Sequence, residues 1–276
     1  MKLLLKQTIL FLSAGFISLS TQALTPVNPS GSHPLGMGNA FVSQYGLSAA
    51  FHNQAGLSKI EGLSVTLFYE NKFLLKELSQ QGLLVGIPTK TAKFALSYFS
   101  LGPAEWRESV ISLACAKQLS SKLSAGIQFN YFGMKLPEEN RTVSTVGEEV
   151  GFIYQVTSKT FAGIHLANPF SVPIKTSNYK EKIPYRIRLG LHSMIADNLK
   201  ISAEAEKSEA VTPLLKVGLE WQVISGLFIR TGYNTGSTKL FFGLGYRYRF
   251  IETNLAFCDH QQLGITPSVS ITFRSK

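Results

Sequence analysis

The sequence predicts an all-β fold, a transmembrane antiparallel β-barrel of about fourteen strands. Hydrophobic residues make up 45% of the chain and charged residues only 16%, whereas soluble domains carry about 25% charged residues. After the N-terminus, no stretch holds the roughly 18 consecutive apolar residues of a membrane-spanning helix. Apolar residues instead alternate with small or polar ones in short segments, which is typical of strands with one apolar face.

The N-terminus has the composition of a secretory signal peptide. Lys2 and Lys6 give it a positive start, Ile9–Leu19 form an apolar core, and Thr21–Ala23 supply a small-residue cleavage site. This apolar core is too short to anchor the chain in a membrane. We therefore expect residues 1–23 to be removed on export, which leaves residues 24–62 and 63–276 as the two parts of the mature chain.

Fourteen segments of residues 63–276 alternate in the manner of half-exposed strands. Connections after even-numbered segments are mostly short, and those after odd-numbered segments, such as Lys135–Thr145 and Ala167–Ile183, are often longer. Outer-membrane barrels pair short periplasmic turns with longer outer loops. The sequence therefore predicts a bacterial outer-membrane protein with both chain ends in the periplasm. The segments are Leu63–Tyr69, Leu83–Ile87, Phe94–Tyr98, Ser109–Lys117, Leu123–Tyr131, Val146–Tyr154, Ala162–Leu166, Tyr185–Leu191, Leu199–Lys207, Leu215–Trp221, Leu227–Tyr233, Leu240–Tyr246, Ile251–Phe257 and Leu263–Phe273.

Aromatic residues collect at both ends of the outward-facing positions. When the apolar face of each segment is taken as the outer one, the last outward residue is often aromatic, whichever way the segment runs. Two aromatic girdles are typical of a barrel at the two membrane surfaces, whereas a soluble β-sandwich does not predict placement by strand direction. The residues are Tyr69, Tyr98, Tyr131, Tyr154, Trp221, Tyr233, Tyr246, Phe257 and Phe273.

Glycine is frequent on the opposite, inward-facing positions. Glycine weakens a strand and usually marks a bend or a close backbone approach. Inward glycines therefore predict free space along the inner wall of the barrel. Residues 24–62, which are rich in Gly, Ala, Ser and Asn, would fill this space as a plug. The alternative is that these glycines only shape the curvature of the barrel. They are Gly86, Gly126, Gly151, Gly163, Gly190, Gly218, Gly232, Gly243, Gly245 and Gly264.

Charged residues of both signs also fall on inward positions of neighbouring segments. Glu204, Glu206 and Glu220 alternate along the sequence with a larger set of basic residues, and the whole chain carries a formal charge of +10. Cross-strand ion pairs are one interpretation. Attraction of an acidic head group passing through the lumen is the other, and the two are compatible. The basic positions, which are candidate ligand contacts, are Arg186, Arg188, Lys200, Lys216, Arg230 and Arg247.

The residues that carry catalysis or bind metals are few. The five histidines and the two aspartates, Asp197 and Asp259, show no spacing of a catalytic triad or of a metal site. We therefore expect no enzyme activity, no metal and no cofactor, and export argues against a nucleic-acid partner. Outer-membrane lipid and lipopolysaccharide are the expected surroundings, with phosphate contacts from the basic loop residues Arg107, Arg141, Lys175, Lys180 and Lys182.

Two stretches before the first strand resemble a known family. LGMGNAFV, Leu35–Val42, and SAAFHNQAGL, Ser48–Leu57, are similar to the N-terminal signature of FadL-type long-chain fatty-acid transporters and of the related PorV/PorQ-type proteins. The resemblance implies a fourteen-stranded barrel with an N-terminal hatch and transport of hydrophobic or amphipathic small molecules, with a lipophilic ligand. The alternative that it leaves open is an accessory role in type IX protein secretion, with a secretion-machinery protein as partner, or an outer-membrane scaffold. The motif residues are Gly36, Met37, Gly38, Asn53, Gln54, Ala55, Gly56 and Leu57.

The chain departs from that family pattern at three places. Gln54 stands where the family usually has Pro, so a rigid turn in the hatch is lost. Pro267 lies within the last predicted strand and removes one ladder donor, which either loosens the seam with the first strand or is tolerated as a bulge. Arg274–Lys276 follow Phe273, whereas such barrels usually end on the aromatic residue itself.

Overall fold

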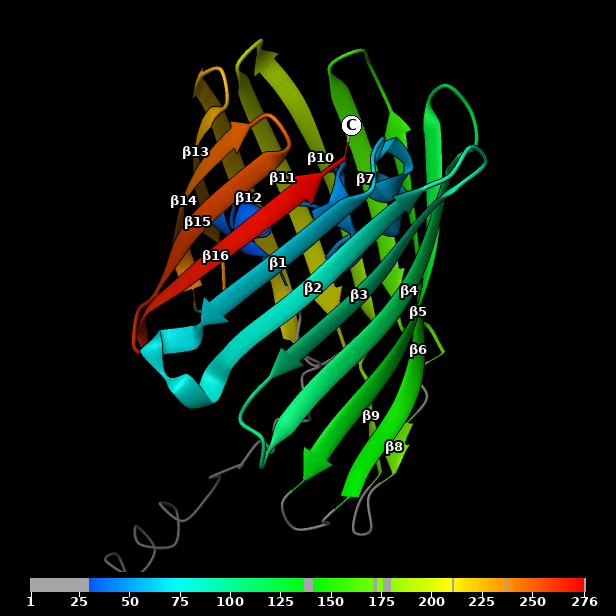
Figure 1. Cartoon of the computed structure of the whole chain (residues 1–276), viewed down its shortest axis with the longest axis vertical. Helices are drawn as coiled ribbons and strands as arrows, with labels where there is room; N and C mark the ends of the chain where they lie inside the picture. The colour runs from blue at the N-terminus through cyan, green and yellow to red at the C-terminus, as the bar shows by residue number, and fades with distance from the viewer. Residues whose placement is uncertain are drawn as a thin grey trace, which may run out of the picture.

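A computed structural model describes residues 30–136, 141–170, 173–175, 180–209, 211–236 and 238–275. Fourteen antiparallel strands form a closed barrel (Figure 1), because the first strand pairs with the last as well as with the second. The predicted fold class, an all-β closed barrel, is confirmed. The predicted signal peptide, residues 1–23, lies outside the described residues.

Each predicted strand segment overlaps one barrel strand, in the same order along the chain. The observed strands are generally longer than the predicted segments, and two short strands, β8 and β9, pair with each other outside the barrel within the β7–β10 connection. The strands are β1 (Ser64–Asn71), β2 (Ser79–Pro88), β3 (Lys93–Leu101), β4 (Arg107–Gln118), β5 (Leu123–Leu136), β6 (Arg141–Gln155), β7 (Thr160–Ala167), β8 (Pro173–Lys175), β9 (Lys180–Lys182), β10 (Arg186–Ala196), β11 (Leu199–Ser208), β12 (Val211–Ile224), β13 (Leu227–Asn234), β14 (Thr238–Tyr248), β15 (Ile251–His260) and β16 (Gly264–Arg274).

The connections differ between the two ends of the barrel. The end that carries the C-terminus, at the top of Figure 1, has the short turns, such as residues 197–198 between β10 and β11. The other end has the longer connections, which include two short 3₁₀ turns, η3 (Lys72–Leu74) and η4 (Lys76–Leu78), and the β8–β9 hairpin. Parts of the predicted loops Lys135–Thr145 and Ala167–Ile183 lie outside the described residues, as do the side chains of Arg141, Lys175, Lys180 and Lys182.

The outer surface of the barrel is apolar, as the alternation predicts. Outward residues of the strands, such as Leu113, Phe129 and Leu189, are about half exposed, whereas their neighbours in sequence point inward. All nine aromatic residues of the predicted girdles are exposed on this surface, so their outward placement is confirmed. Among the described residues, no helix is both long and apolar enough to cross a membrane.

Residues 30–62 lie inside the circle of strands, where Figure 1 shows them in blue. They form one short α-helix, α2 (Ser32–Gly36), and two 3₁₀ helices, η1 (Leu47–Phe51) and η2 (Gln54–Lys59). Most of these residues are buried, and Leu57 packs with Phe68, Leu84 and Phe99 of the barrel in one apolar cluster. This N-terminal segment therefore occupies the interior of the barrel.

The seam between β1 and β16 accommodates Pro267. The two strands pair from Ser64 with Arg274 to Glu70 with Ser268. Pro267 lies just beyond that ladder and is opposite Phe257 of β15. Since the barrel closes through the residues that follow Pro267, the proline does not interrupt the seam.

Candidate functional site in the barrel lumen

The inner wall of the barrel is built from glycines where the N-terminal segment approaches it. Eight of the ten predicted inward glycines would, with a Cβ added, meet atoms of residues 36–60. Gly163 faces the carbonyl of Val42, Gly126 faces the backbone at Gln54, and Gly232 faces the amide of Gly38. Side chains at these positions would occupy the same space as the segment. The glycines therefore match the shape of the wall to a backbone that lies directly against it.

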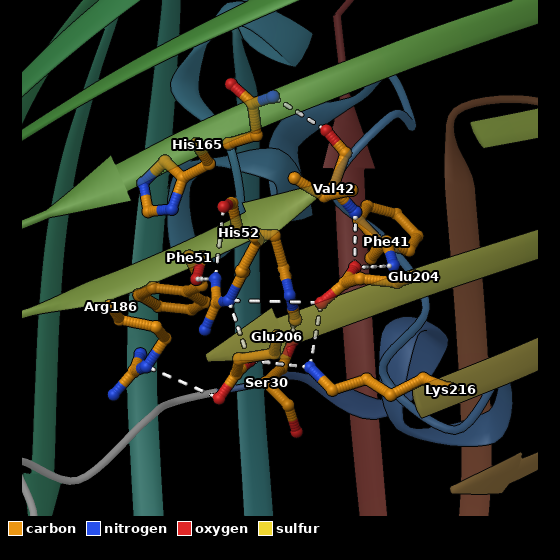
Figure 2. Close-up of polar contacts among 12 residues, drawn as sticks. Ser30, Phe41, Val42, Phe51, His52, His165, Arg186, Glu204, Glu206 and Lys216 are labelled. Carbon is orange, nitrogen blue, oxygen red and sulfur yellow. Dashed lines mark hydrogen bonds and ion pairs between the residues drawn. The ribbon is translucent and has the colours of Figure 1, made fainter. Parts of the chain in front are cut away.

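A buried carboxylate on β11 holds the middle of the segment (Figure 2). The Oε2 atom of Glu204 accepts hydrogen bonds from the amides of Phe41 and Val42, at 2.9 and 2.8 Å. Its Oε1 atom accepts a third bond from Lys216 Nζ on β12, at 2.8 Å. Two adjacent main-chain amides aimed at one carboxylate form a specific anchor, because hydrogen bonds to charged groups are stronger than neutral ones.

Three cations of neighbouring strands surround the second carboxylate, Glu206. Lys216 Nζ and Arg188 Nε lie 2.7 and 2.9 Å from its Oε2 atom. Arg186 Nε lies 3.4 Å from its Oε1 atom. The charges are thus engaged with one another across β10, β11 and β12, as the cross-strand interpretation predicts.

Arg188 connects this ion-paired group to the segment. Its Nη1 atom donates to the carbonyl oxygen of His52 at 3.0 Å (Figure 2). Burial, together with the nearby Arg188, holds the pKa of His52 well below its usual range. The ring is therefore neutral at neutral pH, and its Nε2 atom lies 3.3 Å from the carbonyl of Ser30.

A second ion-paired group lies further around the wall, on β11–β13. Glu220 contacts Lys200 Nζ at 2.6 Å and Arg230 Nε at 2.6 Å. His33 of helix α2 lies 2.9 Å from the same carboxylate. Arg230 is 1% exposed and also donates to Asn254 at 2.8 Å. This group therefore holds the start of the segment as the Glu204 group holds its middle.

The asparagine and glutamine of the motif bind the adjoining part of the wall, on β6 and β7. Asn53 Nδ2 lies within hydrogen-bonding distance of three carbonyls, of Val42 at 2.7 Å, Phe152 at 3.1 Å and Ile164 at 3.2 Å. Its Oδ1 atom accepts from the amide of Ala55 and so caps η2. Gln54, which replaces the usual proline, donates from Nε2 to Glu149 on β6 at 2.6 Å. The residue that departs from the family pattern is thus a contact between segment and wall.

Glu149 gathers further partners that sequence reasoning did not single out. Its carboxylate lies 2.9 Å from His165 Nε2 and accepts from Asn130 Nδ2 at 2.8 Å. At the turn end, Glu252 pairs with Arg247 and Arg274, each at 2.8 Å. Both glutamates are inward residues of strands with regular alternation, so the parity that identified Glu204 also identifies them.

The structure brings the six predicted lumen cations to the inner wall, each beside a carboxylate. Arg186, Arg188 and Lys216 share the Glu204 and Glu206 carboxylates, Lys200 and Arg230 share Glu220, and Arg247 shares Glu252 with Arg274. Contact of these cations with a ligand stays a prediction. The described residues contain no group of three or more His, Cys, Asp or Glu side chains placed to hold a metal ion.

Several spaces remain beside the segment, and two of them lie towards the two ends of the barrel. At the turn end, a vestibule of about 340 Å³ is lined by Tyr45, Lys59, Arg247 and Arg274 among others. Towards the longer connections, a smaller cavity of about 40 Å³ lies between η1 and the inner faces of β3–β7 and β10.

No family model and no curated protein matches the sequence. Solved structures do match. The monoaromatic hydrocarbon channel CymD superposes with a TM-score of 0.65 at 14% identity, over 91% of this chain and 99% of that one. The toluene transporter TodX of Pseudomonas putida gives 0.65 at 13% identity, over 90% and 99%. A FadL homologue of Pseudomonas aeruginosa gives 0.62 at 13% identity, over 91% and 99%.

The chain has the fold of the FadL-type barrels. The structural match extends the resemblance of the N-terminal motif to the fourteen strands, although the identities of 12–14% establish the shared fold and not a shared substrate.

Proposed function

We propose that this protein is an outer-membrane transporter for small apolar or amphipathic molecules, with residues 24–62 as a plug that closes its lumen. The observation that carries the proposal is the match between wall and segment. Eight inward glycines make room for the segment, and a buried carboxylate binds two of its amides. An inner wall whose glycines fit the backbone of an inserted segment is expected in a plugged transporter and not in an open, water-filled pore.

The surface of the barrel supports the membrane location. Lipid-facing positions carry apolar side chains, and aromatic residues flank them at both ends. Only a closed barrel or a helix satisfies its backbone hydrogen bonds within lipid, and this barrel is closed. We place the short turns and both chain ends on the periplasmic side and the longer connections outside.

The class of substrate rests on the fold together with the structures that share it. Two of those structures are described as a monoaromatic hydrocarbon channel and a toluene transporter. A plugged barrel of this type admits a molecule by a change in the plug, and the ligand supplies the energy through tighter binding to the open state. The lumen cations are neutralised in pairs, so they would contact a ligand only after such a rearrangement.

A disulfide that locks the plug to the wall tests this function. Ser32 Oγ and Ser268 Oγ are 2.8 Å apart, so the double variant Ser32→Cys with Ser268→Cys places two thiols at bonding distance in a background with Cys258→Ala. We expect cells that make the oxidised form to lose most of the uptake of radiolabelled toluene, and reduction to restore it. Each single-cysteine variant serves as control. Unchanged uptake in the oxidised double variant would contradict a mobile plug, and no uptake of any apolar or amphipathic probe above vector-only cells by the wild type would refute transport.

A role in protein secretion or as a scaffold stays the alternative. A docking protein would contact the connections at residues 135–145 and 167–183, and these lie partly outside the described residues.

A further inference from the structure

The small cavity next to η1 has one apolar side and one polar side. Phe51, Phe99, Val110 and Phe132 form the apolar side. The polar side includes Gln128 and His165, which are 3% and 1% exposed. A cavity of about 40 Å³ holds a few waters or a small polar group, since one water needs roughly 10–15 Å³ by this measure.

Two hydrogen-bond acceptors on the polar side have no partner among the residues that the structure describes. Gln128 Oε1 is buried without one, while its Nε2 atom donates to Asn130 at 2.8 Å, which fixes the orientation of the amide. His165 Nδ1 is also buried without a partner within the described chain. Its Nε2 atom faces the Glu149 carboxylate at 2.9 Å, which can only accept, so in the neutral ring Nδ1 is the acceptor.

The cations beside the cavity are already engaged. Arg188 lies 2.9 Å from Glu206 and donates to the His52 carbonyl, and Arg186 lies 3.4 Å from Glu206. An anionic head group would have to displace those partners. A group that donates hydrogen bonds can pair with either acceptor after a small shift of the surrounding side chains, and leaving a buried acceptor unpaired is unfavourable.

We propose that this cavity is a subsite for the hydrogen-bond-donating head of an uncharged ligand, a hydroxyl group attached to an aromatic or short apolar body. The hydroxyl occupies the cavity and donates to Gln128 or His165, and the body extends out of the cavity past the apolar side chains at its edge. This inference rests on the proposed transport function and specifies its substrate: a phenol or alcohol in preference to a plain hydrocarbon or a carboxylate. Asn168 Oδ1 also lacks a partner within the described residues, but it lies against the backbone of Gly147 and is not needed.

Four probes with one aromatic body test the subsite. p-Cresol carries a hydroxyl donor, 4-methylanisole an acceptor alone, toluene no polar group, and p-toluate an anion. Initial uptake of each radiolabelled probe is measured at a concentration far below saturation, in cells that make the full-length protein, above vector-only cells. We expect p-cresol to enter about tenfold faster than 4-methylanisole or toluene, the discrimination of one hydrogen bond to a buried acceptor.

Gln128→Met removes one acceptor and keeps the length of the side chain. We expect it to lower the ratio of p-cresol to 4-methylanisole severalfold, because only His165 remains as an acceptor. Gln80→Met is the matched control, because Gln80 is a buried inward glutamine of β2 that does not line this cavity. It should keep the wild-type ratio.

The outcomes separate the two proposals. Equal uptake of the four probes by the wild type, or preference for p-toluate, overturns the subsite and leaves transport intact, with water as the occupant of the cavity. An unchanged ratio in Gln128→Met overturns the role of that residue as acceptor. No uptake of any probe above vector-only cells overturns transport and the subsite together.

Discussion

Replacing Glu204 with Gln tests the anchor between the segment and the wall. The wild-type carboxylate accepts from the amides of Phe41 and Val42 and from Lys216. Glutamine keeps the size of the side chain but removes the charge, and its Nε2 atom cannot accept from an amide or an ammonium group. Lys216 retains Glu206 at 2.7 Å, so the barrel keeps most of its ion pairing.

The magnitude follows from the bonds that weaken. Hydrogen bonds to a charged group contribute about 1.5–3 kcal/mol each, and disrupting a buried ion pair costs about 3–5 kcal/mol. Because Gln retains one acceptor and Lys216 keeps a partner, we expect about 3 kcal/mol less stabilisation of the docked segment. That difference corresponds to roughly a hundredfold larger population of segments detached from this carboxylate.

Hydrogen exchange measured by mass spectrometry on the protein in nanodiscs provides the assay. Peptides that contain Phe41 and Val42 should exchange about a hundredfold faster in Glu204→Gln, while peptides of the barrel strands keep their protection. Glu209→Gln removes the same charge at an exposed position after β11 and should leave both unchanged. If the folded Glu204→Gln protein exchanges these amides within about threefold of the wild-type rate, the carboxylate is not the anchor.

Three further changes probe other contacts of the same site. Gly163→Val places a side chain against the Val42 carbonyl, so we expect ion current through single reconstituted barrels to rise; Ala162→Val, the neighbouring residue that faces outward, should leave it at the wild-type level. Gln54→Leu removes the 2.6 Å bond to Glu149 and should raise the exchange of η2 amides about tenfold, the effect of one charge-assisted bond; protection equal to wild type would contradict this role. Arg230→Met leaves Glu220 with Lys200 and His33 alone, so we expect the barrel to unfold with about 3 kcal/mol less stability in urea; an unchanged midpoint would show that the pair is dispensable.

Features that repeat with the period of a strand could be predicted from the sequence. Alternation located the fourteen barrel strands, and the outward aromatics followed from the same parity. The ion pairs could also be predicted from the sequence, because consecutive antiparallel strands place Glu204 opposite Lys216 and Arg188 opposite Glu206. Glu149 and Glu252 lie on the same inward parity and could have been predicted with Glu204, Glu206 and Glu220, but they were not.

The contacts between the segment and the wall could not be predicted in the same way. Phe41 and Glu204 are 163 residues apart, and Gln54 and Glu149 are 95 apart. Residues 30–62 form short, irregular turns without a repeating pattern, so their register against the wall follows from packing and not from periodicity. Inward glycines were the signal for a close backbone approach, but they do not say which residue approaches. The short β8–β9 hairpin likewise has no alternation long enough to reveal it.

The central claim is that residues 24–62 close the barrel, and ion conductance in planar bilayers tests it most directly. The wild-type protein should show little or no current, because the segment fills the space between the glycine-lined walls. A variant that lacks residues 24–62, and whose refolded barrel is verified by its heat-dependent mobility in gels, should conduct ions steadily. A folded deletion barrel that stays closed, or a wild-type barrel that conducts as freely as the deletion, would contradict the claim.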